Sequence, residues 1–269
     1  IISYTMINKI LKSFYLTSKI LEKKHNYFIN LKFLKLYKTD TGKYYLPYFA
    51  KYDIIKKAII NNKVFDKEIY DNAKQFIKPN SIVLDIGSNY GQLSILYSLL
   101  NKNVEVHSFE ADPYIYKILK KNILINNVNV HGYNYIVGDK NISQFIFEEK
   151  LSNKNYFTYG SKKINIVKNI NIVKNVNKVK KVKSTKIDDL KFNKKISFMK
   201  IDTQGYDLKV LIGSEKTIKS HKMPIIFEFE EGFKKEFNYD FKDFENFFKI
   251  INYKISKELQ NNNYLILPK

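Results

Sequence analysis

From Ser81 onward, short apolar runs alternate with stretches of helical periodicity, and this alternation constrains the fold more than any other feature of the sequence. The run SIVLDIG has the length and composition of a buried strand, and the following GQLSILYSLLN spaces its apolar residues as a helix does. Strands joined by crossover helices in this way build a parallel sheet. The elements predicted first are strands at 81–87, 104–110 and 128–138 and helices at 91–101 and 112–127.

A stretch rich in Lys and Asn interrupts the alternation between residues 141 and 190. It begins with one predicted strand, SQFIFEE, and contains the pentapeptide NIVKN twice. The alternation of Ile or Val with Asn or Lys over 163–184 is compatible with an exposed extended hairpin and equally with a flexible insertion. The alternation then resumes, with predicted strands at 196–202 and 224–230, helices at 206–220 and 240–251, and two closing antiparallel strands, YKIS and NYLILP.

The residues ahead of this pattern are interpreted as an extension. Apolar residues at helical spacing, with Lys between them, predict an amphipathic basic helix over 7–24, which either packs on the domain or lies on a membrane surface. The turn DTG at 40–42 predicts a hairpin over 32–50, and residues 52–78 have a helical pattern. The predicted division is an extension at 1–50 and an α/β domain at 51–269, with the Lys/Asn-rich insertion at about 150–186.

The chain has a formal net charge of +21, which would fit a nucleic-acid partner. All 47 of its basic residues are Lys, however, and none is Arg, whose planar fork suits the recognition of phosphates and bases. Asn, Ile, Tyr and Phe are abundant together with Lys. We therefore interpret the charge as a solvated surface of biased composition, and we do not expect a nucleic acid as the partner.

Several classes of protein are excluded by what the sequence lacks. There is no Cys, so disulfides and thiolate chemistry are impossible, and the four His do not have the spacing of a zinc site. No metal is expected. No apolar run approaches the roughly 18 residues of a membrane span, and no signal peptide is recognisable, so we predict a cytoplasmic protein. Peripheral membrane contact through the basic N-terminal helix is the alternative to packing of that helix on the domain.

The strongest local signal is VLDIGSNYG, which joins the first strand of the alternation to its helix. This is the carboxyl end of a parallel strand, where open α/β sheets bind ligands. Gly87 and Gly91 allow a sharp turn and a close approach of the backbone to a ligand. Asp85 is a candidate acceptor for an amine or for the loop itself, and Asn89 is expected to orient the turn.

Glu110 ends the next strand, where an acid accepts hydrogen bonds from ribose hydroxyls. The alternative is that it only caps the following helix. A dinucleotide site would need G-x-G-x-x-G to seat a pyrophosphate at the helix N-terminus. Here Tyr90 and Gln92 flank Gly91, and no third glycine follows. The pattern favours a cofactor without a pyrophosphate.

The segments VLDIGSNYGQLSILYSLL, VHSFEADP, TKIDDL, FMKIDTQGYDLKVLIGSEKTI and PIIFEFE occur in the order seen in FkbM-type methyltransferases, and the chain resembles that family over roughly residues 40–267. The resemblance implies a Rossmann-like α/β fold of the class I methyltransferase type, with a seven-stranded, mostly parallel sheet and helices on both faces. It implies S-adenosyl-L-methionine as the cofactor. The family's cofactor-binding positions fall on Asp85, Gly87, Asn89, Gly91 and Glu110. The family includes enzymes that O-methylate hydroxyls of sugars and natural products.

The third signal is KIDTQGYD, at the end of the strand that faces the methyl donor in such a fold. Methyl transfer to a hydroxyl requires alignment of the acceptor oxygen, and a base that takes its proton helps. Asp202 is the candidate base or substrate-orienting residue, Gln204 is a candidate hydrogen-bond partner of the acceptor, and Glu228 on the next strand is a second carboxylate able to reach the site. The alternative is that Asp202 and Glu228 only orient loops.

The sequence therefore predicts an S-adenosylmethionine-dependent O-methyltransferase that acts on a hydroxyl of a glycan or small molecule. Two alternatives stay open. The net charge suggests a nucleic-acid methyltransferase, although the lack of Arg and of an aromatic base-stacking motif argues against it. The basic helix and the Lys-rich stretch suggest a non-catalytic binding module associated with a membrane or a glycan.

Overall fold

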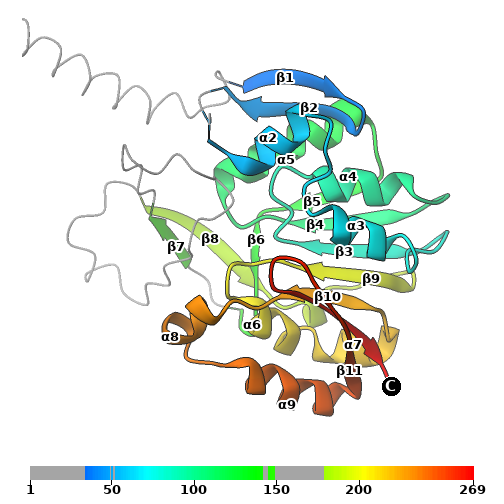
Figure 1. Cartoon of the computed structure of the whole chain (residues 1–269), viewed down its shortest axis with the longest axis vertical. Helices are drawn as coiled ribbons and strands as arrows, with labels where there is room; N and C mark the ends of the chain where they lie inside the picture. Colours follow the sequence, from blue (N-terminus) through cyan, green and yellow to red (C-terminus); the bar gives the residue numbers. More distant parts are fainter. Residues whose placement is uncertain (1–33, 49, 51, 142–144, 149–178) are drawn as a thin grey trace, which may run out of the picture.

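The computed structural model describes residues 34–48, 50, 52–141, 145–148 and 179–269 of the chain. Within these ranges the largest unit is a seven-stranded sheet, which crosses the middle of the molecule in Figure 1. Its strands are β3 (Ile82–Ile86), β4 (Glu105–Phe109), β5 (Val130–Tyr133), β9 (Ile196–Ile201), β10 (Ile225–Glu228), β11 (Tyr253–Leu259) and β12 (Asn263–Pro268). The predicted basic helix at 7–24 lies outside the described residues, as does most of the Lys/Asn-rich stretch.

The sheet has the strand order β11-β12-β10-β9-β3-β4-β5. Neighbouring strands from β10 to β5 pair parallel, whereas β12 pairs antiparallel with both β10 and β11. The prediction of a seven-stranded, mostly parallel sheet closed by two antiparallel strands is confirmed. The chain winds from β3 to β5 in one direction and from β9 to β10 in the other. The winding therefore reverses between β3 and β9, and open α/β sheets bind their ligands at such a point.

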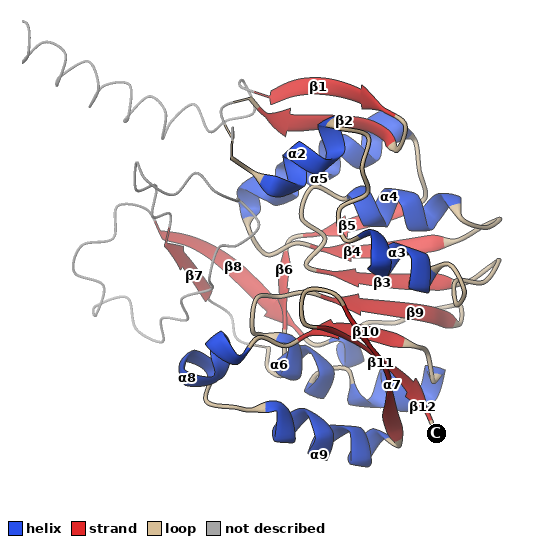
Figure 2. Cartoon of the chain, viewed as in Figure 1, coloured by secondary structure: helices blue, strands red, loops and turns tan. Residues whose placement is uncertain are grey.

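Helices cover both faces of the sheet, as predicted (Figure 2). One face carries α3 (Lys67–Ala73), α4 (Gln92–Leu99) and α5 (Pro113–Asn126), and the other carries α6 (Asp207–Ile212), α7 (Glu215–His221) and α9 (Phe241–Ile251). The start of α5 follows from its sequence. Asp112 accepts hydrogen bonds from the backbone N–H groups of Tyr114 and Ile115, and Pro113 occupies the first turn.

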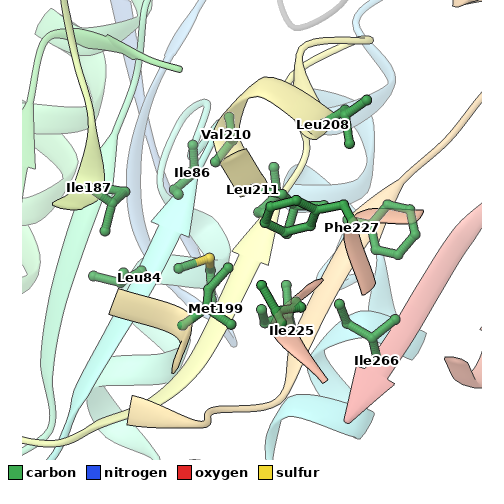
Figure 3. Close-up of a cluster of buried hydrophobic side chains, with 14 of the residues drawn as sticks. Leu84, Ile86, Ile187, Met199, Leu208, Val210, Leu211, Ile225, Phe227 and Ile266 are labelled. Atoms are coloured by element: carbon green, nitrogen blue, oxygen red, sulfur yellow. The ribbon is translucent and has the colours of Figure 1, made fainter. Parts of the chain in front are cut away.

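Two apolar cores lie against the two faces, because neighbouring residues of a strand point to opposite sides. In β3, Val83 packs toward α3 and α4, while Leu84 packs toward α6 and α7. Phe198 and Met199 of β9 divide in the same way. Figure 3 shows the core on the side of α6, and Leu84, Met199 and Phe227 belong to the same cluster as the buried side chains of α6. Each such side chain contributes roughly 1.5–3 kcal/mol when fully buried, so the cores fix the strands and leave the loops at their carboxyl ends to carry a site.

The predicted hairpin is present and docks on α5. The N-terminal elements are β1 (Leu34–Thr39), β2 (Gly42–Pro47) and α2 (Ile54–Ile60). Figure 1 shows the hairpin lying over α2 and α5. Asn122 of α5 bonds to the backbone N–H and carbonyl of Tyr45, and Asn126 bonds in the same way to Lys43. The hairpin is thus held by side-chain-to-backbone hydrogen bonds. The division of the chain at residue 50 stays a prediction.

The prediction of a single strand at 128–138 is wrong, because the structure has two strands there, in different sheets. A second sheet, of order β6-β8-β7, consists of β6 (Tyr135–Val137), β7 (Phe145–Glu148) and β8 (Val179–Thr185). The break falls at Asn134, whose Nδ2 donates to the carbonyl oxygens of Glu110 and Ala111. This amide ties the end of β5 to the turn after β4 and directs the chain out of the main sheet. Of the stretch at 163–184, the structure describes only 179–184, which is extended.

Two predicted helices are each divided in two. Residues 52–78 form α2 and α3, and residues 206–220 form α6 and α7. The second division lies at Gly213, where an added Cβ would come within 1.9 Å of the carbonyl oxygen of Gly138, so the two backbones touch. The remaining short helices are η3 (Ile187–Asp189), η4 (Glu231–Phe233) and α8 (Lys234–Phe237). None of the described helices combines the length and the apolar character that a membrane span requires.

Candidate active site

A pocket of about 480 Å³ opens at the carboxyl ends of β3, β4, β9 and β10, where the winding of the sheet reverses. Its volume is that of a small-molecule site. Seven of the eight predicted site residues line it: Asp85, Gly87, Asn89, Glu110, Asp202, Gln204 and Glu228. The eighth, Gly91, is the N-cap residue of α4. The structure therefore brings the three sequence motifs together.

The turn after β3 requires its two glycines. Gly87 has a φ of 81°, and a Cβ there would lie 1.8 Å from the carbonyl oxygen of Asp202. Gly91 has a φ of 86°, and a Cβ there would lie 2.4 Å from Leu119. Both positions thus combine a left-handed backbone with close packing. Asn89, between them, also has a left-handed φ of 51°, which Asn tolerates better than most residues.

Glu110 joins the turn after β3 to the turn after β4. One carboxylate oxygen accepts from the backbone N–H of Asn89 at 2.9 Å, and the other accepts from that of Asp112 at 2.8 Å. Burial raises the pKa of Glu110 to about 7, although these two donors oppose the shift. The cap of α5 is Asp112, not Glu110. The carboxylate of Glu110 is thus fixed in orientation at the pocket wall.

Asp85 is fully buried at the end of β3. Its Oδ2 accepts a hydrogen bond from Ser94, which in turn accepts one from Ser108 at 2.5 Å. Its Oδ1 has no hydrogen-bond partner among the described residues, and burial raises the pKa of this carboxyl group. A buried acceptor without a donor is costly, and this one belongs to a residue that lines the pocket.

Lys200 of β9 is a functional candidate that the sequence analysis passed over. Its buried ammonium lies 3.1 Å from Asp202 Oδ2 and 3.7 Å from Asp85 Oδ1, and it donates to the carbonyl oxygen of Gly87 at 3.0 Å. Burial alone would lower the pKa of Lys200, but the facing carboxylates of Asp202, Asp85 and Asp66 raise it above its usual value. The signal available was a Lys inside the mostly apolar run ISFMKI, which was predicted to be a buried strand.

The predicted catalytic residues form one hydrogen-bonded group. The Nε2 of Gln204 lies 3.4 Å from Asp202 Oδ1 and 3.2 Å from Glu228 Oε2 and can donate to either. Buried Asp207, the first residue of α6, supports the group by accepting from Thr203 and from the backbone N–H of Glu228. Burial, together with the nearby negative charges of Asp202 and Asp207, raises the pKa of Glu228 to about 10.

Asp66 is a second residue that the sequence analysis missed. It lies on the turn before α3, lines the pocket, and faces Asp202 and Lys200. Burial, and next the charge of Asp202, raise the pKa of Asp66 to about 6. The sequence carried no signal for this role, because the turn joins two short helices and contains no motif.

The pocket is acidic although the chain is strongly basic. Its lining includes the carboxyl groups of Asp66, Asp85, Glu110, Asp112, Asp202, Glu228 and Glu230. Among the described residues that line it, Lys200 is the single cation. The local field therefore favours a positively charged or neutral ligand over an anion.

These features fit a nucleoside cofactor that carries a positive charge. The turn from Gly87 to Asn89 lines the pocket, Glu110 offers a carboxylate for sugar hydroxyls, and Asp85 adds a buried carboxyl oxygen that has no hydrogen bond. In the described part of the chain, no three His, Asp or Glu side chains are grouped so that they could hold a metal ion.

A seven-stranded sheet whose winding reverses at β3, with a glycine turn after β3 and an acid after β4, defines the class of Rossmann-like methyltransferases. Residues 85–255 match the family described as methyltransferase FkbM domain, and the chain belongs to this family. Membership implies S-adenosylmethionine as the cofactor.

Three solved structures illustrate the likeness. The methyltransferase FkbM from Methylobacillus flagellatus KT is 15% identical, with a TM-score of 0.44, over 74% of this chain and 50% of that one. A putative rRNA methylase from Clostridium thermocellum is 10% identical, with a TM-score of 0.46, over 74% and 92%. A precorrin-6y C5,15-methyltransferase from Geobacter metallireducens GS-15 is 12% identical, with a TM-score of 0.41, over 76% and 89%. This chain thus spans half the length of the first. No curated protein sequence matches it.

Proposed function

We propose that this chain transfers the methyl group of S-adenosylmethionine to a hydroxyl oxygen of a glycan or small molecule. The observation that carries the proposal is the position of Asp202. Its backbone touches the glycine turn after β3, and its carboxylate lines the same pocket as Glu110. A base and a cofactor site that share one pocket are what a transfer to a hydroxyl requires.

The residues of the turn and of β4 are assigned to the cofactor. Glu110 accepts hydrogen bonds from the sugar, the backbone from Gly87 to Asn89 contacts the cofactor closely, and Asp85 contributes negative charge. The bound cofactor supplies an electrophilic methyl group on a sulfonium. The chain's own task is then to bind the acceptor, to align its oxygen and to take its proton.

Asp202 is the better candidate for the base. Its negative charge is balanced by the ammonium of Lys200 at 3.1 Å. Glu228, with a pKa raised to about 10, holds its proton near neutral pH and so cannot accept another. Glu228 and Gln204 then orient Asp202 and the acceptor by hydrogen bonding.

The charge of the pocket supports a hydroxyl acceptor that carries no phosphate. Seven carboxyl groups line the pocket against one ammonium, and even with Glu228 protonated the ionised ones repel a polyanion at the point where the chemistry would take place. The pocket is therefore acidic although the whole chain has a net charge of +21. This counts against the nucleic-acid alternative, while the cytoplasmic location and the peripheral membrane contact stay predictions.

The test is labelled methyl transfer from S-adenosylmethionine to a panel of sugars and glycans, with Asp202→Asn and Glu228→Gln as variants. Asp202→Asn should lose about 10²–10⁴-fold in rate, the usual contribution of a general base, and this loss should exceed any loss of cofactor affinity. Glu228→Gln, which imitates the protonated side chain, should lose less. Absence of cofactor binding in calorimetry would contradict the proposal. If the Asp202→Asn variant transferred methyl groups at the wild-type rate, Asp202 would not be the base.

A further inference from the structure

The turn between α2 and α3 closes the pocket from outside the segment that defines the family. The family match begins at residue 85, whereas this turn spans residues 61–66. Gln92, the first residue of α4, accepts from the backbone N–H of Phe65 at 2.9 Å and donates to the carbonyl oxygen of Lys63 at 2.9 Å. The turn is therefore fastened directly to the helix that begins at the cofactor turn.

Asp66 ends this turn with a carboxylate that serves no local structure. It occupies the N-cap position of α3, yet its side chain makes no capping hydrogen bond. Its φ of 53° is left-handed, a conformation that Asp tolerates better than most residues. The unused cap leaves the side chain without a role in the helix. Asp66 lines the pocket instead, and its carboxyl group interacts with the charges of Asp202 and Lys200.

Two parts of the pocket wall differ in charge. Ala111, Ile136 and Val137 line it beyond β4, whereas Asp66, Asp85 and Asp202 lie around the ammonium of Lys200 beside β3 and β9. Three carboxylates against one ammonium leave a formal excess of two negative charges in the second part. Glu110 lines the pocket as well, at the tip of β4.

The methyl donor has a matching polarity. Its adenine is flat and weakly polar, its ribose lies in the middle, and its far end carries a sulfonium, an ammonium and a carboxylate, which together leave a net positive charge. If Glu110 holds the ribose and the apolar part of the wall holds the adenine, the ammonium would point toward the acidic part. Asp85 contributes there a buried oxygen that has no hydrogen bond and lies 3.7 Å from the ammonium of Lys200.

We propose that Asp66 binds the α-ammonium group of the methyl donor and so completes the cofactor site from outside the family domain. This inference rests on the proposed function. It assigns to Asp66 a contact with the amino-acid part of the cofactor and none with the adenosine part. S-Adenosylhomocysteine has both parts, and 5′-methylthioadenosine has only the second, so the two ligands isolate the contact.

The experiment is calorimetric titration of the full chain with these two ligands, for the wild type and for Asp66→Asn and Asp66→Ala. Asn adopts the left-handed region readily, so the first variant keeps the turn. We expect Asp66→Asn to lower the affinity for S-adenosylhomocysteine by about tenfold or more, which is the effect of losing one charged hydrogen bond. The affinity for 5′-methylthioadenosine should stay within about twofold of the wild-type value, which is a smaller change than the loss of one hydrogen bond would cause. Asp66→Ala should show the same selective loss.

The matched control is Asp71→Asn, which lies on α3 but pairs with Lys67 and Lys74 at the surface. It should change neither affinity. Equal losses of affinity for both ligands, or no loss for S-adenosylhomocysteine, would overturn the role of Asp66 but leave the proposed function standing. A wild-type chain that binds neither ligand would overturn the proposed function and this inference with it.

Discussion

At the scale of single residues, the site depends on a few charged side chains that hold backbone turns together. The ammonium of Lys200 touches the turn after β3 through the carbonyl oxygen of Gly87, and it touches the turn after β9 through Asp202. Glu110 does the same for the turns after β3 and β4. Because each of these groups is both charged and structural, changing one alters the geometry and the electrostatics of the pocket together.

Replacement of Lys200 by Met should destabilise the fold strongly. The change leaves the carboxylates of Asp85 and Asp202 without their buried counter-charge, which typically costs about 3–5 kcal/mol. Urea unfolding of the apoprotein measures it. Lys219→Met, which removes an exposed partner of Glu215, is the control and should cost less than about 1 kcal/mol. If both changes lower the free energy of unfolding by the same small amount, Lys200 does not stabilise the buried carboxylates as argued.

The ionisation of Glu110 should control cofactor affinity near neutral pH. Its pKa is raised to about 7, and ribose hydroxyls donate to the ionised form, so affinity should increase as pH rises through 7. 5′-Methylthioadenosine is the probe, because it lacks the ammonium group and so reports on the sugar contact. Between pH 6 and 8 the ionised fraction rises about tenfold for such a pKa, and the affinity should rise with it. A Glu110→Gln variant should bind weakly at both pH values; a pH response retained in that variant would assign it to another group.

At the scale of elements, packing of turns against one another positions the site. A side chain at Gly87 would meet the carbonyl oxygen of Asp202 at 1.8 Å, so the tips of β3 and β9 are in backbone contact. This contact requires a glycine, and it also sets where Asp202 lies relative to the cofactor turn.

Gly87→Ala should therefore separate the two tips and remove cofactor binding. The new methyl group meets backbone, which cannot rotate away, and the φ of 81° is unfavourable for Ala. Calorimetry with S-adenosylhomocysteine and thermal unfolding measure the two consequences. Gly232→Ala is the matched control, since a Cβ there meets nothing within 4 Å. Cofactor affinity unchanged by Gly87→Ala would show that the two tips can move apart at no cost.

The elements that could be predicted are those whose signal is local. The buried strands at 81–87 and 196–202 and the helix that starts at Asp112 have clear periodicity or a cap. The break at Asn134 could not be predicted, because it depends on hydrogen bonds that its side-chain amide donates to a turn 23 or 24 residues earlier in the chain. Asp66 could not be predicted for the same reason: its importance comes from Lys200 and Asp202, which are distant in sequence. The motifs thus located the pocket, but the contacts between motifs needed the fold.

At the scale of the whole molecule, two opposite fields coexist. The chain carries 47 basic and 26 acidic residues, and the pocket collects seven of the acidic ones around one Lys. Screening in salt water limits interactions to about 8–10 Å between exposed charges. The basic surface and the acidic pocket therefore act on different ligands.

This separation predicts that polyanions bind the surface without entering the site. RNA or heparin should bind at low ionic strength, and the affinity should fall steeply with salt, because Lys contacts release counterions from a polyanion. Neither should compete with S-adenosylhomocysteine, since the carboxyl groups of the pocket repel phosphate and sulfate. Fluorescence anisotropy over a salt series measures the first effect, and calorimetry with and without the polyanion measures the second. Displacement of S-adenosylhomocysteine by RNA, or methylation of that RNA, would instead mean that the basic surface delivers the acceptor and that the field of the pocket does not select it.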